Sequence, residues 1–124
     1  MKGGAKMGQT PLFDVDINHN GTADTVTVRG EIDLVSAPQF RDAFADLGSQ
    51  VLVDLRGVTF IDSSGLAVLI DQKHKMMNGG DLRIVANSPP VLRLFEIAGL
   101  TEFFKPIPDP VSRDSDAESN EVAS

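Results

Sequence analysis

The sequence contains no cysteine among its 124 residues. Disulfide frameworks, thiolate zinc sites and cysteine nucleophiles are therefore excluded. Positive charge is scarce, because 11 basic residues stand against 18 acidic ones and give a formal net charge of -7. A chain of this charge repels phosphate backbones and anionic lipid surfaces, so we expect no direct binding to nucleic acid or membranes. No apolar run approaches the length of a membrane span, and the N-terminus lacks the apolar middle of a signal peptide. A cytoplasmic protein is the expectation.

The length and the ends of the chain predict one domain between two extensions. A chain of this size buries roughly two-thirds of its unfolded surface, which suffices for one core. Residues 1–10 carry two lysines and no apolar stretch, and they are predicted to form a flexible extension. Residues 107–124 hold five acids against Arg113 and are interrupted by proline, which is typical of a disordered acidic tail. Residues 11–106 are predicted to form the domain.

The first half of the domain is predicted to form a hairpin and a helix. Apolar residues alternate with aspartates over 13–17, and the alternation resumes at Val26 and Val28 after a turn near Gly21. Ser36 and Gln39 have the spacing of a capping box, and apolar residues follow at helical spacing. We therefore expect an antiparallel hairpin followed by a helix over 37–47.

The second half alternates predicted strands and helices. Residues 51–55 form an apolar run that is typical of a strand at the centre of a sheet, and a turn is expected at 55–57. A helix from about 62 to 78, a strand over 82–86 and a helix over 89–98 follow. Phe103 and Phe104 form either a short last strand or an apolar plug. This order predicts an α/β fold with a mixed sheet of four to five strands and helical crossovers.

A carboxylate and two hydroxyls gather where the middle helix is expected to begin, in the run Asp62-Ser63-Ser64-Gly65-Leu66. On local chemistry alone, Asp62 or Ser63 is the N-cap, and Gly65 permits the close approach of another backbone. Free amides and the helix dipole at this terminus could accommodate an anion. The loops at 30–36 and 58–65 are therefore the expected place of the site.

Three segments together resemble the STAS domains of the anti-sigma factor antagonist family. The run 62–66, which follows the apolar run 51–55, resembles the family signature. Residues 30–37 resemble the first conserved loop of the family, and residues 88–100 resemble its final helix. The segments occur in the family's order and cover about residues 12–104, so the resemblance implies a single STAS-like domain.

The resemblance implies a regulatory binding module. Such a protein, when unphosphorylated, binds an anti-sigma factor that is also a serine kinase, and it thereby frees a sigma factor. Phosphorylation by that kinase reverses the binding. The family pattern places the modified residue at Ser63, and it places Asp33 near that site, where we expect it to serve recognition rather than the fold. The implied partner-binding residues are Asp33, Phe60, Asp62, Ser63, Ser64, Gly65 and Leu66, although Phe60 could also belong to the core.

The partners implied by this resemblance are proteins. The kinase would carry the ATP, and a phosphatase would remove the phosphate. The chain itself is expected to hold no cofactor or metal, to have no catalytic residues and to be a monomer in isolation.

Two rival interpretations are weaker. A serine hydrolase needs a base and a glycine two residues before the nucleophile, whereas His19 and His74 lack an evident serine partner and Ile61 precedes Ser63 by two positions. A nucleotide site needs a phosphate-binding loop, and the glycine pairs of this chain lack its spacing and its lysine. The remaining alternative is a STAS scaffold that is not phosphorylated, or a regulatory subunit of another signalling or transport assembly.

Overall fold

The computed structural model describes residues 12–19, 21–76 and 79–107. Its elements are β1 (Phe13–His19), β2 (Asp24–Ile32), α1 (Ala37–Asp42), β3 (Gln50–Ile61), α2 (Ser63–Lys75), β4 (Asp81–Val85), α3 (Pro89–Ile97) and α4 (Thr101–Phe104). The predicted extension at 1–10 and residues 108–124 of the predicted tail lie outside the described residues. None of the described helices is both long and apolar enough to span a membrane.

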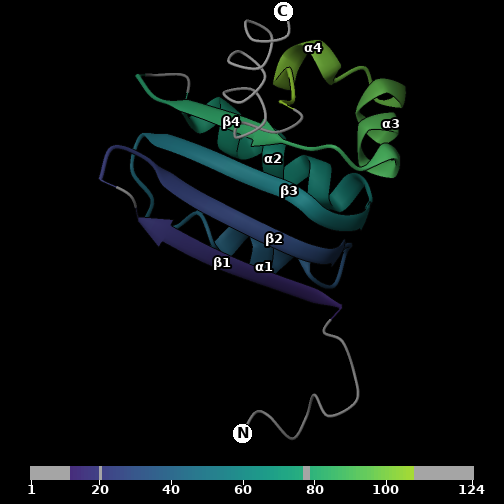
Figure 1. Ribbon diagram of the computed structural model, residues 1–124, viewed down its shortest axis with the longest axis horizontal. Coiled ribbons are helices and arrows are strands. Elements are labelled where there is room, and N and C mark those ends of the chain that lie inside the picture. Colours follow the sequence, from purple (N-terminus) through teal and green to yellow (C-terminus); the bar gives the residue numbers. More distant parts are fainter. Residues whose placement is uncertain (1–11, 20, 77–78, 108–124) are drawn as a thin grey trace, which may run out of the picture.

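Within the described residues, four strands form one mixed sheet in the order β1-β2-β3-β4 (Figure 1). β1 is antiparallel to β2, whereas β2, β3 and β4 are mutually parallel. α1 and α2 lie on one face of the sheet, and α3 and α4 lie on its β4 side (Figure 1). The predicted α/β fold with a mixed sheet is confirmed, and β3 occupies the internal position expected for it. The parallel order places the carboxyl ends of β2, β3 and β4 at one edge.

β3 is longer than predicted, because it has 12 residues and continues through the segment 55–57 that we expected to be a turn. Its pairing with β2 shifts between Thr27 and Arg29 and again between Gly30 and Glu31. Each shift inserts one extra residue into β3, as in a β-bulge. The buried positions after Leu55 are therefore spaced by three instead of two, and strict alternation could not identify the second half of this strand.

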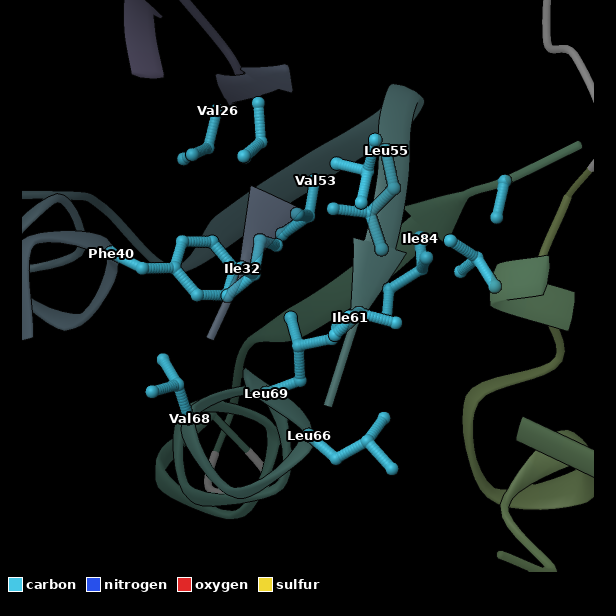
Figure 2. Close-up of a cluster of buried hydrophobic side chains, with 14 of the residues drawn as sticks. Val26, Ile32, Phe40, Val53, Leu55, Ile61, Leu66, Val68, Leu69 and Ile84 are labelled. Atoms are coloured by element: carbon cyan, nitrogen blue, oxygen red, sulfur yellow. The ribbon is translucent and has the colours of Figure 1, made fainter. Parts of the chain in front are cut away.

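The core lies between the sheet and the helices on its covered face. Phe40 of α1 and Leu69 of α2 point toward the strands that carry Ile32, Val53 and Ile84 (Figure 2). All five of these side chains are fully buried. Burial of a large apolar side chain contributes roughly 1.5 to 3 kcal/mol, so this cluster fixes α1 and α2 against the sheet.

α1 ends earlier than predicted. The helix covers Ala37–Asp42, and the following residues form turns. The amide of Phe44 donates to the carbonyl of Arg41 at 3.1 Å, and the amide of Ala45 donates to that of Asp42 at 3.1 Å. These bonds span three residues, so the chain tightens into a 3₁₀-type turn after residue 42.

The C-terminal part of the domain closes over the core with aromatic side chains. Phe104 belongs to α4 and stacks on Phe95 with ring centroids 5.3 Å apart, so the plug is correct and the alternative strand is not. Ile107 forms an isolated parallel bridge with Val85. The first residue of the predicted tail therefore still pairs with the sheet.

Candidate functional site

The two acidic positions singled out from the sequence follow directly on neighbouring strands. Ile32 and Ile61 pair in register at the carboxyl ends of β2 and β3. The amide of Asp62 donates to the carbonyl of Ile32 at 3.1 Å. Asp33 begins the loop before α1, whereas Asp62 is the single residue between β3 and α2, so the segment 58–65 expected to be a loop is strand and helix instead. Both aspartates lie at the edge of the sheet where the site was expected.

Asp62 is the N-cap of α2, and Ser63 is the first residue of the helix. One carboxylate oxygen of Asp62 accepts from the amide of Ser64 at 2.8 Å and from that of Gly65 at 3.4 Å. Asp62, and not Ser63, is therefore the residue that caps α2. The carboxylate of Asp62 thereby occupies two of the amides that were expected to be free for an anion.

Ser63 is exposed, whereas Ser64 is half-buried. Within the described residues, neither hydroxyl forms a hydrogen bond. The Ser63 hydroxyl is therefore available to a macromolecule that docks on this edge of the sheet, and any group attached to it would extend into solvent.

Asp33 organises the loop that leads into α1. Its Oδ1 atom accepts from the amides of Val35 and Ser36, each at 3.0 Å. The Ser36 hydroxyl accepts from the amide of Asp33 at 2.9 Å and lies 3.1 Å from the carbonyl oxygen of Glu31. The Ser36 side chain thus ties the loop together and does not form the predicted capping box. Asp33 therefore also serves the local fold, which the sequence did not predict, whereas its expected part in recognition stays a prediction.

We expect Asp33→Ala to lower the melting temperature by a few degrees and Asp33→Asn to change it little, because asparagine retains the accepting oxygen. The Ser36 backbone amide holds the pKa of Asp33 below its ordinary value of 3.8. A lowered carboxyl pKa stabilises the fold above the ordinary pKa, and this contribution is lost as the pH falls through the folded-state pKa. Thermal melts of both variants from pH 7 to acid check this. Equal melting of Asp33→Ala and the wild type would contradict it.

Gly65 and Leu66 lie beneath the exposed hydroxyl. A Cβ atom on Gly65 would lie 2.7 Å from Ile32 Cγ2 and 2.7 Å from Ile61 Cγ1. The close approach expected at this glycine is real, and side chains rather than another backbone fill the space. Leu66 is 6% exposed. Both residues are buried and support the site from the core, and a direct contact of either with a partner stays a prediction.

Phe60 leaves 46% of its surface exposed, whereas the neighbouring Ile61 is 5% exposed. Phe60 and Ile61 pair in unbroken register with Glu31 and Ile32, so their side chains lie on opposite faces of the sheet. Of the two interpretations left open for Phe60, the structure favours a surface position beside the site.

Two apolar residues at this edge were missed from the sequence. Leu34 is 74% exposed and Val35 is 86% exposed, in the loop between Asp33 and Ser36. The available signal was a pair of apolar residues inside a predicted loop, directly before a predicted N-cap.

The histidines lie away from Ser63. His19 is at the opposite end of the sheet, where its Nδ1 lies 2.8 Å from Asp24 Oδ1. His74 is eleven positions further along α2, which corresponds to about 16 Å of helix. No group of three or more His, Asp or Glu residues within the described ranges could hold a metal ion.

A family model for the STAS domain matches residues 14–115. The chain belongs to the STAS domain family. The anti-sigma-B factor antagonist of Bacillus subtilis is 34% identical over 94 residues, which are 73% of this chain and 86% of that protein. The anti-sigma-F factor antagonist RsfB of Mycobacterium tuberculosis is 30% identical over 92 residues, which are 71% of this chain and 75% of that protein.

A solved structure supports the same STAS assignment. The crystal structure of an anti-sigma factor antagonist from Mycobacterium paratuberculosis matches with a TM-score of 0.75 at 27% identity. The match covers 84% of this chain and 92% of that chain. Together with the family model, these similarities confirm the STAS resemblance drawn from the sequence motifs.

Proposed function

We propose that this chain is an anti-sigma factor antagonist that, when unphosphorylated, binds an anti-sigma factor serine kinase and thereby frees a sigma factor. Relatives with 34% and 30% identity that bear the name of anti-sigma factor antagonists support this general role. The observation that carries the finer proposal is the exposed Ser63 hydroxyl, which forms no hydrogen bond within the described residues and follows the N-cap Asp62.

The unphosphorylated surface suits a docking partner. Its centre consists of residues that are each exposed or half-buried, namely Asp33, Phe60, Asp62, Ser63 and Ser64. A serine hydroxyl is small and uncharged, so its burial costs far less than that of an anion. The buried residues Gly65 and Leu66 fix the start of α2 against the ends of the strands. This limits the conformational entropy that is lost on binding.

Phosphorylation of Ser63 would reverse this binding. The Ser63 oxygen attacks the γ-phosphorus of ATP held by the kinase, the new O–P bond forms as ADP leaves, and a base of the kinase takes the hydroxyl proton. The product carries about -1.5 to -2 charge beside the Asp62 carboxylate. Because Asp62 already accepts from the amides of Ser64 and Gly65, the phosphate dianion would face the partner surface. A phosphatase would hydrolyse the ester and restore the hydroxyl.

A displacement assay tests the proposed role. Preformed complexes of each sigma factor and anti-sigma factor kinase of the source organism are mixed with the unphosphorylated chain and separated by gel filtration. We expect release of free sigma factor from one of them and a stable complex between the kinase and this chain. The Ser63→Asp variant should release little. Failure to displace any sigma factor at high excess would favour the alternative, a STAS scaffold or a regulatory subunit of another assembly.

A further inference from the structure

We infer that Leu34 and Val35 form an apolar anchor that inserts into an apolar pocket on the anti-sigma factor kinase, and that basic side chains surround this pocket. The inference rests on the proposed function and adds the chemistry of the partner surface. In this proposal, Leu34 and Val35 contribute the binding free energy that the small Ser63 hydroxyl cannot supply.

Exposure of this pair is high and local. Leu34 is 74% exposed and Val35 is 86% exposed, although single exposed apolar residues are common on protein surfaces. These two are consecutive, and they directly follow Asp33 at the edge of the sheet where Asp62 joins β3 to α2. Adjacent exposed apolar side chains beside a functional edge are typical of a protein interface.

The backbone that presents the pair is fixed before binding. The carboxylate of Asp33 accepts from the amide of Val35, and the amide of Ala37 donates to the carbonyl of Asp33 at 2.8 Å. Ser36 is 8% exposed and ties the base of the loop to Glu31. Because the loop is already ordered and valine has a stiff χ1 torsion, little conformational entropy remains to be lost on docking.

The charge around the pair indicates which partner it fits. Residues 31–36 and 60–66 contain Glu31, Asp33 and Asp62 and no lysine or arginine. A second copy of this chain would bring these like charges together, which opposes self-association through this surface. A partner with an apolar pocket and a basic rim would bury the side chains of Leu34 and Val35. Its basic side chains would pair with the nearby carboxylates. Such a rim would also leave binding sensitive to the salt concentration.

The double variant Leu34→Ser/Val35→Ser tests the anchor, and Ile97→Ser is the matched control because Ile97 is 73% exposed on the last turn of α3. Purified anti-sigma factor kinases of the source organism are first titrated with the wild-type chain by calorimetry. For the kinase that binds, we expect the double variant to bind at least about tenfold more weakly, as for truncation of a buried interface anchor. Ile97→Ser should bind as the wild type does.

Steady-state phosphorylation gives a second measurement. Loss of an anchor that contributes equally to the ground state and the transition state raises KM and leaves kcat nearly unchanged. The double variant and Ile97→Ser should retain the wild-type melting temperature, because the side chains of Leu34, Val35 and Ile97 are largely exposed to solvent.

The possible outcomes separate the anchor from the proposed function. Wild-type binding together with unchanged affinity and KM for the double variant would overturn the anchor and leave the proposed function intact. An equal loss in Ile97→Ser would also overturn it. A concentration-dependent wild-type dimer in sedimentation that the double variant abolishes would reassign the pair to self-association. Absence of wild-type binding to every kinase would remove the proposed function and the anchor together.

Discussion

Stoichiometric phosphorylation of Ser63 is expected to weaken binding to the anti-sigma factor kinase about hundredfold, which corresponds to roughly 3 kcal/mol. The phosphate adds about -1.5 to -2 charge to a surface that already holds Asp33 and Asp62. Desolvation of this charge against the partner carries the cost, because the amides of Ser64 and Gly65 that could have stabilised it already bind Asp62, and the basic side chains inferred on the partner already pair with the carboxylates of this surface. Calorimetric titration of the phosphorylated and unphosphorylated chains measures the difference.

Variants at Ser63 separate charge from loss of the hydroxyl. Ser63→Ala should bind as the unphosphorylated wild type does and should accept no phosphate. Ser63→Asp should stay folded and bind weakly, because its side chain is exposed and carries a single charge. Ser64→Ala is the neighbouring control and should bind and be phosphorylated. Undiminished binding by the phosphorylated wild type would contradict the switch.

Gly65→Ala is expected to destabilise the protein by about 2 kcal/mol, because an added methyl group overpacks a filled core. The new Cβ would lie 2.7 Å from atoms of both Ile32 and Ile61, and these β-branched side chains have little freedom to move aside. Relief of the contact would shift the start of α2, and with it Ser63, away from the ends of β2 and β3. A fall in melting temperature of roughly 10 °C is the expected result by thermal denaturation.

Gly48→Ala is the matched control for this substitution. A Cβ on Gly48 would meet only Asp24 Oδ2, at 3.5 Å, which is an ordinary contact. The variant should be as stable as the wild type or slightly more so, because alanine restricts the unfolded chain. Equal melting temperatures of Gly65→Ala and Gly48→Ala would contradict this prediction. They would show that the core around Gly65 accepts the added methyl group without a loss of stability.

The sequence predicted the fold best where one physical signal acted alone. The apolar run 51–55 identified the internal strand, and the aspartate before two serines identified the start of α2. The second half of β3 was missed because two bulges break the alternation on which strand prediction depends. Arg56 and Gly57 lie in this irregular stretch, and their composition alone is typical of a turn.

The sequence predicted where the candidate site lies, but not the hydrogen bonds and exposed side chains within it. The sequence located Asp33, Asp62 and Ser63 at one edge, and the structure places them there, directly after the paired ends of β2 and β3. It could not tell that Asp33 holds its own loop, because an acceptor three residues before an N-cap and a recognition carboxylate have the same local sequence. The exposure of Leu34 and Val35 was hidden for a similar reason, since apolar residues next to a helix start usually pack inward.

A phosphosite map of the chain tests the central proposal most directly. The wild-type chain and the Ser63→Ala and Ser64→Ala variants are incubated with the kinase identified by binding and with ATP, and their peptides are analysed by mass spectrometry. We predict one phosphate, on Ser63, in the wild type and in Ser64→Ala, and none in Ser63→Ala. A phosphate on Ser64, or an unmodified wild-type chain bound to an active kinase, would contradict it.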